Sequence, residues 1–371
     1  MSNNNNTNNN NFSKYKINKR NQNVNNSQKV SCIACNPKGE KPNIIVGFDN
    51  GMIKLFNFTE TGNLVCDNNL LNYHRNIVTC ILFNPINSLI FVSCSIDNSL
   101  ILWNLMNNDI SCEIKTNAIS NDRSSKLIFN YDGSIICVRY DNYIKLYKII
   151  FQSSNENNHI NISLNRGIRY NTETYGDNHN YSFFFHPSKN VLFVGFDNPD
   201  YIYIFYINEQ NQLTILSRFI LTTYIFSSCV NIIGNTLFLV DTDNRYLSMF
   251  SISEGYKKLE KMNRYNLTEY FDQYPDIIPL SHPKNSEILL LYDFFNIIIL
   301  QIISSRIKCL YKYKHPTKIT SCSFNFLGNA IIFSSENKLV ILELKYNIRN
   351  NNSLNRGLKI LGNMPISVSS T

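Results

Sequence analysis

Residues 74–105 read HRNIVTCILFNPINSLIFVSCSIDNSLILWNL. It holds three short apolar runs, rich in β-branched and aromatic residues, which is typical of strands. Asn84-Pro85 separates the first run from the second, and Asp97-Asn98 separates the second from the third. Asn tolerates positive φ and Asp accepts hydrogen bonds from nearby backbone N–H groups, so Asp-Asn suits a tight turn. The stretch therefore predicts three antiparallel strands with a hairpin between the second and third.

The same pattern recurs along the chain. Each unit has a first strand that ends in Asn or His, an apolar run, an acidic turn residue and a third apolar run. The strand ends are Asn36, Asn84, Asn130, His186, Asn231, His282 and Asn325. The turn acids are Asp49, Asp97, Asp141, Asp197, Asp243, Asp293 and Glu336. We expect more polar fourth strands near residues 63–66, 110–115, 159–163, 213–217, 256–261, 307–311 and 358–361. Units of about 45 residues with four strands predict an all-β fold, a seven-bladed β-propeller with four-stranded antiparallel blades.

Residues 74–105 resemble a WD40 repeat. His74, Ser93, Asp97 and Trp103 match the structural tetrad of that family, in which the imidazole bridges the turn Asp and the Ser, and the Ser accepts from the indole N–H. The resemblance, weaker outside this unit, covers about residues 30–344 and implies a platform for protein partners. Blade seven keeps the His as His315. Trp103 is the single Trp of the chain, and its place in the other blades is taken by Phe56, Tyr147, Phe205, Phe250, Leu300 and Leu342.

No motif for catalysis or metal binding emerges. The chain has no nucleophile elbow, no zinc-protease helix motif and no phosphate-binding glycine loop. Cys32 and Cys35 lie in the strand-like run VSCIAC, where residues three apart point to opposite faces. The regular repeat of the turn acids indicates that each closes its own turn. We therefore expect no enzyme activity, no cofactor, no metal and no small-molecule substrate.

Residues 288–303 are apolar but are interrupted by Asp293 and Asn296. A transmembrane helix needs about 20 predominantly apolar residues, so two strands joined at Asp293 explain the stretch better and we expect no transmembrane segment. Ten cysteines with no secretory signal before them favour a reduced, intracellular chain, cytoplasmic or nuclear.

The two ends differ from the middle in composition. Residues 1–29 are rich in Asn and hold Lys and Arg but no acidic residue, and residues 345–371 are likewise basic. The basic residues of these two ends account for the whole net charge of the chain, which is +8. The residues between the two ends are therefore close to neutral. We expect a disordered basic tail at 1–29, the propeller at 30–362 and a C-terminal tail at 363–371.

The function predicted from the sequence is a non-enzymatic scaffold or adaptor that binds protein partners on the propeller faces, as a subunit of a multiprotein complex. Residues after the acidic turns are expected to line one rim: Gly51, Ser99, Tyr143, Arg245, Phe295 and Lys338. Aromatic and Arg side chains often anchor interfaces, which favours Tyr143, Arg245 and Phe295 as partner-binding residues.

Two alternative functions stay open. The first is a nucleic-acid-associated factor, in RNA processing or chromatin, that uses the basic tails. The second is a phosphoinositide-binding propeller, but the Phe-Arg-Arg-Gly motif of that family is absent and Leu-Asn-Arg-Gly at 164–167 is only a distant likeness.

Two segments compete to complete the outer edge of the last blade: residues 12–17 and residues 358–361. We favour the C-terminal one, because it follows the third strand of blade seven after a loop similar to that in blade three. Blades one and seven would then meet only by packing of their faces.

Overall fold

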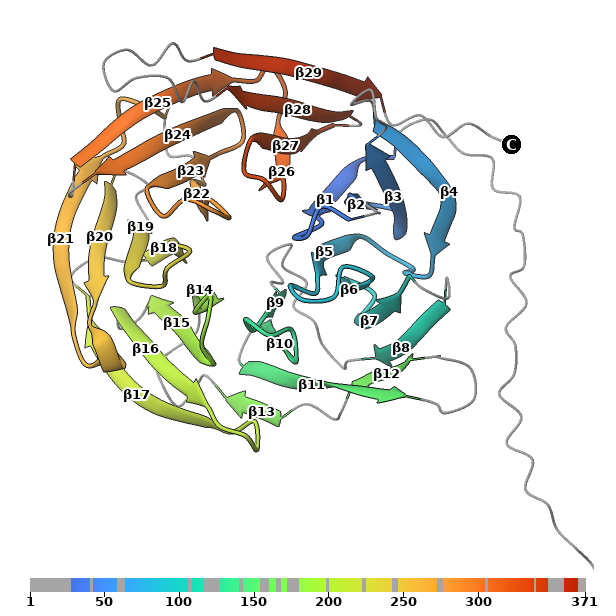
Figure 1. Ribbon diagram of the computed structural model, residues 1–371, viewed down its shortest axis with the longest axis horizontal. Coiled ribbons are helices and arrows are strands. Elements are labelled where there is room, and N and C mark those ends of the chain that lie inside the picture. Colours follow the sequence, from blue (N-terminus) through green and yellow to red (C-terminus); the bar gives the residue numbers. More distant parts are fainter. Residues whose placement is uncertain are drawn as a thin grey trace, which may run out of the picture.

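Seven antiparallel sheets stand around a common axis (Figure 1). The computed structural model describes residues 28–40, 43–58, 64–105, 109–115, 127–139, 143–153, 160–164, 168–171, 180–197, 200–221, 225–241, 246–271, 276–303, 306–336, 338–345 and 357–365. The sheets confirm the predicted seven blades, and they follow one another in chain order around the ring. The longest helix among these residues is the three-residue 3₁₀ turn η2 (Glu254–Tyr256).

The first four blades hold the strands of the N-terminal half. Blade one comprises β1 (Val30–Cys35), β2 (Ile44–Phe48), β3 (Met52–Phe58) and β4 (Leu64–Asn72). Blade two comprises β5 (Val78–Phe83), β6 (Ile90–Ser95), β7 (Ser99–Asn104) and β8 (Asp109–Lys115). Blade three comprises β9 (Leu127–Phe129), β10 (Ile135–Arg139), β11 (Tyr143–Ser153), β12 (Ile160–Leu164) and β13 (Ile168–Asn171). Blade four comprises β14 (Asn180–Phe185), β15 (Val191–Asp197), β16 (Asp200–Ile207) and β17 (Leu213–Ile220).

The last three blades continue the ring. Blade five comprises β18 (Ile225–Val230), β19 (Thr236–Asp241), β20 (Tyr246–Ile252) and β21 (Leu259–Asn266). Blade six comprises β22 (Ile278–Ser281), β23 (Ile288–Tyr292), β24 (Asn296–Ile303) and β25 (Arg306–Lys314). Blade seven comprises β26 (Ile319–Phe324), β27 (Ala330–Ser335), β28 (Lys338–Lys345) and β29 (Gly357–Pro365).

The residues aligned with Trp103 mark the same structural position in every blade. In six blades the pairing of the third and fourth strands shifts register at this residue, as at Leu102/Trp103 and Met249/Phe250. Blade three differs in that β11 pairs with β13 before Tyr147 and with β12 after it. A break between two short strands there replaces the bulge of the other blades.

The hydrophobic core consists of seven clusters, one between each pair of neighbouring blades. Cys32 packs toward blade two, whereas Cys35 packs toward blade seven. The two thiols therefore point to opposite faces of β1, as the sequence predicted. Second and third strands such as β2, β6, β7 and β23 bury both faces, because each sheet lies between two others, whereas the outer strands β17, β21 and β25 expose alternate residues.

The ring closes through the C-terminal segment. β29 pairs with β28 along its length and forms the outer strand of blade seven, which confirms the favoured candidate. The competing residues 12–17 and the predicted tail, apart from Gln28 and Lys29, lie outside the described residues. The expectation of face packing alone was wrong, because the N–H of Val30 donates to the carbonyl of Glu336 at 3.2 Å and the N–H of Ile33 donates to Ser321 Oγ at 3.3 Å. Strand β1 begins beside the acidic turn of blade seven, which brings these groups together.

The apolar stretch at 288–303 forms β23 and β24, as expected. Within the described part of the chain, no helix has the length and apolar character required to cross a membrane.

Candidate functional site

A chain of buried polar side chains links the four predicted tetrad residues of blade two. The indole N–H of Trp103 donates to Ser93 Oγ at 2.8 Å, and Nε2 of His74 lies 2.7 Å from the same oxygen. Nδ1 of His74 lies 3.5 Å from the Asp97 carboxylate. Three of these side chains, those of His74, Ser93 and Trp103, are almost fully buried. Such a chain stabilises the blade only while every member has a partner.

Ser99 is a fifth member that the sequence reasoning assigned to the rim. Its hydroxyl lies 2.6 Å from His74 Nδ1 and donates to the Asp97 carboxylate, so the imidazole reaches the acid mainly through Ser99. Asp97 also accepts from the N–H groups of Arg75 and Ser99, at 2.6 and 2.9 Å. Burial alone would raise the pKa of Asp97, but the hydrogen bonds from His74, Ser99 and Arg75 outweigh it and hold the pKa well below its usual range.

The other turn acids occupy several different settings. Asp293 is buried and accepts from the N–H groups of Phe295 and Asn296 in its own turn. Asp49 instead accepts from the N–H of Lys29 at 3.1 Å. The backbone of Glu336 has positive φ. Asp197 and Asp200 are the last backbone pair of the ladder between β15 and β16. Asp141 and Asp243 lie outside the described residues.

In blade five the residue that forms a described contact is Asp241, which the sequence reasoning missed. Its carboxylate accepts from the N–H of Tyr246 at 3.3 Å and pairs with the guanidinium of Arg264 at 3.1 Å. The run Asp241-Thr242-Asp243 offers two acids at the end of the second strand, so the sequence pattern alone did not separate them.

Blade seven keeps the His in a different polar chain, in which Thr317 Oγ1 lies 3.2 Å from His315 Nδ1 and 2.6 Å from Ser335 Oγ. His315 is buried, and its Nδ1 lies 3.0 Å from the Thr317 carbonyl. The strand pairing places Phe333 where blade two has Ser93, and the two rings of His315 and Phe333 meet edge to face at 5.1 Å. An aromatic contact thus stands where blade two has a hydrogen bond.

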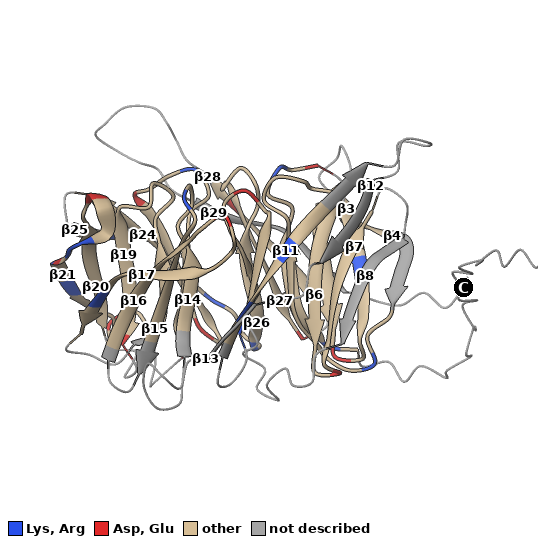
Figure 2. Cartoon of the chain, turned by 90° about the horizontal axis from the view of Figure 1, so that it is seen from below, with Lys and Arg blue, Asp and Glu red and all other residues tan. Residues whose placement is uncertain are grey.

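The turns between first and second strands, here called the a–b turns, connect neighbouring blades. The strand-end side chain accepts N–H groups of its own turn, as Asn84 does from Ile86 and His282 from Lys284. It also reaches the next blade: Asn84 Nδ2 donates to the Gly133 carbonyl at 2.8 Å, and His282 Nε2 lies 3.0 Å from the Gly328 carbonyl. Because consecutive strands are antiparallel, the described a–b turns lie on one face of the disc and the described acidic turns lie on the other. Figure 2 shows the sheets from the side, with their turns gathered at the two faces.

The a–b face carries apolar side chains in every blade. The residue directly after each strand end is apolar: Pro37, Pro85, Tyr131, Pro187, Ile232, Pro283 and Phe326. Three turns expose a further aliphatic side chain, because Ile86 is 53%, Ile233 59% and Leu327 54% exposed. We call this set of ten residues the apolar annulus. Single exposed apolar residues are ordinary, but a set gathered at one face is a feature of binding surfaces.

The predicted rim on the opposite face is only partly exposed. Phe295 is 42% exposed, whereas Gly51 and Ser99 are buried and were wrongly expected on the rim. The side chain of Tyr143 and the whole of Arg245 lie outside what the structure describes.

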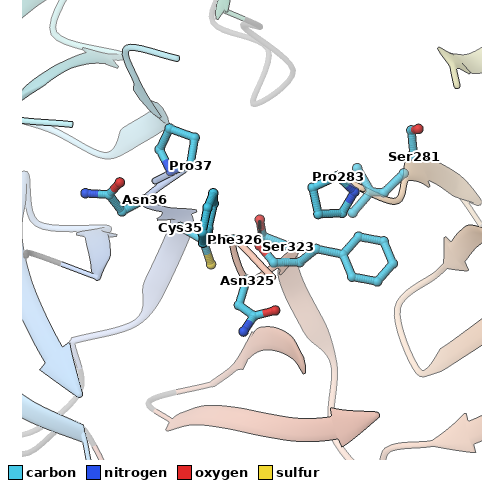
Figure 3. A pocket seen from close by; sticks show the side chains of 10 residues that line it. Cys35, Asn36, Pro37, Ser281, Pro283, Ser323, Asn325 and Phe326 are labelled. Carbon is cyan, nitrogen blue, oxygen red and sulfur yellow. Dashed lines mark hydrogen bonds between the residues drawn. The ribbon is translucent and has the colours of Figure 1, made fainter. Parts of the chain in front are cut away.

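A pocket of about 230 Å³ lies on the a–b face, between blades one, six and seven (Figure 3). Pro37 stands on one side and Pro283 on the other, with Phe326 between them. Its other lining residues are Cys35, Asn36, Leu280, Ser281, Ser323, Phe324 and Asn325.

Positive charge is not confined to the tails. The outer strand β25 exposes Arg306, Lys308 and Lys312 and contains no acidic residue. Charged outer strands resist edge-to-edge association of sheets, which is a sufficient role for these residues. The basic tails proposed for nucleic-acid binding lie almost wholly outside the described residues.

Among the described residues, no cluster of His, Cys, Asp or Glu has the arrangement of a metal site. Burial raises the pKa of Cys35 to about 12 and raises that of Cys137 further, so these thiols stay protonated and weakly nucleophilic at neutral pH. The described cysteines form no disulfide.

Comparison with known proteins agrees with this geometry over part of the chain. A family model described as WD domain, G-beta repeat matches residues 67–104, which span β4 to β7. A comparison with curated proteins finds no match to the chain.

Proposed function

Because the chain is a seven-bladed WD40-repeat β-propeller, we propose that it is a non-enzymatic scaffold that binds protein partners on its faces, as a subunit of a multiprotein complex. Propellers of this family generally act as protein-interaction platforms. The observation that carries the proposal is the apolar annulus, because it leaves apolar side chains of every blade at one face of a rigid disc.

The geometry suits a platform for three reasons. The seven core clusters fix the blades relative to one another, so the turns present a preformed surface. The hydrogen bonds from strand-end residues to the next blade hold the a–b turns in place. Turns of several blades lie side by side on each face, so one disc can contact several segments of a partner.

The opposite face supplies a second candidate surface. Phe295 is exposed there, and Tyr143 and Arg245 follow the acidic turns of their blades in the sequence. Interface anchors are often aromatic or Arg residues, which supports these three as partner-binding residues.

Affinity purification of the full-length chain from its own cells, with quantitative mass spectrometry, tests the proposal. We expect wild type to recover at least one protein in stoichiometric amount. Ile86→Glu, Ile233→Glu and Leu327→Glu combined should lose a partner that docks on the a–b face, and Phe295→Glu should lose one that docks on the opposite face. Recovery of the wild-type chain alone, as a monomer with hydrolase or transferase activity, would overturn the proposal.

A further inference from the structure

The pocket between blades one, six and seven is a concave feature of the a–b face. We propose that it binds an extended peptide segment of a partner protein, which inserts one bulky apolar side chain and places an acidic residue beside it. This inference rests on the proposed scaffold function and assigns that function a site and a ligand chemistry.

The size of the pocket favours a single side chain. Its volume is about 230 Å³, whereas small-molecule sites are usually about 300–1,000 Å³. Pro37, Pro283, Phe324 and Phe326 supply apolar walls. The amide of Asn325 donates to Asn329 at 2.7 Å, so this polar group of the lining already has a partner within its own turn. An apolar side chain of a partner therefore matches the space better than a polar ligand.

The charges around the pocket select an acidic neighbour for that side chain. The ammonium of Lys284 lies 3.8 Å from the centre of the Phe326 ring, and Lys38 is exposed directly after Pro37. The nearby acids keep their charge but contact other groups: the Glu40 carboxylate accepts from Ser88 of blade two, and that of Glu287 accepts from Gln301 at 3.5 Å. Lys284 therefore places a positive charge directly against the lining, and complementary charge sets specificity and association rate at such surfaces.

The pocket is also held in shape before any ligand arrives. Gly39, at φ +71°, lies so close to Phe326 that a Cβ there would be 3.0 Å from the ring. The N–H of Lys38 donates to Asn36 Oδ1 at 2.9 Å, and the N–H of Lys284 donates to His282 Nδ1 at 3.1 Å. Ordered turns reduce the entropy lost on binding, which favours capture of a flexible peptide.

Two displayed peptide libraries test the proposal against the full-length chain. Both carry one fixed position drawn from Leu, Phe and Trp; its neighbours are Glu in the first library and Lys in the second. The variants are Lys284→Glu and Phe326→Ala. Lys189→Glu is the matched control, because Lys189 is exposed in the equivalent turn of blade four, with its ammonium 5.4 Å from the Tyr256 ring and outside the pocket.

We expect the chain to enrich peptides from the Glu library. Their affinity should fall at least about tenfold in Lys284→Glu and in Phe326→Ala, and stay unchanged in Lys189→Glu. Lys284→Glu changes an exposed turn residue, so it remains informative even if Phe326→Ala weakens the fold. Equal enrichment of both libraries, or equal losses in Lys284→Glu and Lys189→Glu, would overturn the inference.

Failure of the pocket is distinguishable from failure of the scaffold function. Peptides whose affinity is unchanged in Lys284→Glu and Phe326→Ala but falls in Ile233→Glu would show binding elsewhere on the annulus. That result overturns the pocket and leaves the scaffold standing. Enrichment of no peptide, together with stoichiometric co-purification of a protein, has the same meaning.

Discussion

At the scale of single residues, the Ser93 hydroxyl is the shared hydrogen-bond partner of two buried side chains. Trp103 donates to its hydroxyl, and His74 Nε2 lies at hydrogen-bond distance from it. Ser93→Ala would leave both without this partner, which costs about 1–3 kcal/mol of unfolding free energy. Ser286→Ala, in the a–b turn of blade six, is the control and should change it by less than about 0.5 kcal/mol. Urea unfolding gives both values, and equal effects would show that the polar chain does not stabilise blade two.

His186 and His282 make folding sensitive to mild acid. Burial lowers the pKa of both imidazoles, with the Lys189 charge contributing at His186. In the unfolded chain the pKa of these residues returns to about 6.5, so the unfolded chain binds more protons than the folded chain at mildly acidic pH. The free energy of unfolding therefore decreases as the pH falls below that value. Asn occupies the same position in the other blades and forms similar bonds.

The double variant His186→Asn/His282→Asn tests this sign. Between pH 7.5 and 5.5, we expect wild type to lose more unfolding free energy than the variant, while the remaining histidines contribute equally to both. Urea titrations at the two pH values provide the comparison. Parallel losses would mean that neither imidazole is held neutral by the fold.

At the scale of the element, the a–b turns depend on glycines in the blade that follows. Gly328 has φ +74°, and a Cβ built there would lie 2.2 Å from the His282 imidazole. Gly255 has φ +78° with nothing within 4 Å, so the pair separates close approach from backbone strain. Gly328→Ala should destabilise the chain by at least about 1–3 kcal/mol more than Gly255→Ala, since overpacking adds to the shared strain. Thermal unfolding measures the difference. Equal decreases in melting temperature would show that the close approach of Gly328 to His282 does not contribute to stability.

The outer strand of blade seven supports a second prediction at this scale. Because β29 completes the last sheet, deleting residues 357–371 should lower the melting temperature by several degrees or prevent folding, since it exposes the edge of β28. Deleting residues 1–25 should leave the melting temperature nearly unchanged. A large loss from the N-terminal deletion would show that the ring closes by another strand.

The sequence predicted these elements well, because turn and strand signals are local. The strand ends, the blade count, the position of Trp103 and the closing segment all follow from short patterns repeated at regular intervals. Ser99 was misplaced because a Ser after Asp-Asn looks like an exposed turn residue, and only the packing of His74 against it buries its hydroxyl. The sequence analysis did not predict the apolar annulus, because the a–b turns of different blades come together on one face only when the ring assembles. The sequence of a single turn carries no information about its neighbours in the ring.

At the scale of the whole molecule, the described blades form a closed disc with two unlike faces. Seven apolar clusters hold all neighbouring blades together, and blade two adds its polar chain to them. The a–b face carries the apolar annulus and the pocket, and the opposite face carries the acidic turns and Phe295. A rigid body with apolar turns on one face is suited to holding partners in a fixed arrangement.

Hydrogen–deuterium exchange of the full-length chain, alone and with its co-purified partner, shows which face of the disc the partner contacts. We expect the partner to slow exchange at the a–b turns, most strongly in those that follow Asn36, His282 and Asn325 around the pocket. Protection confined to the acidic-turn face would contradict binding at the apolar annulus, and no protection anywhere on the disc would contradict the scaffold function.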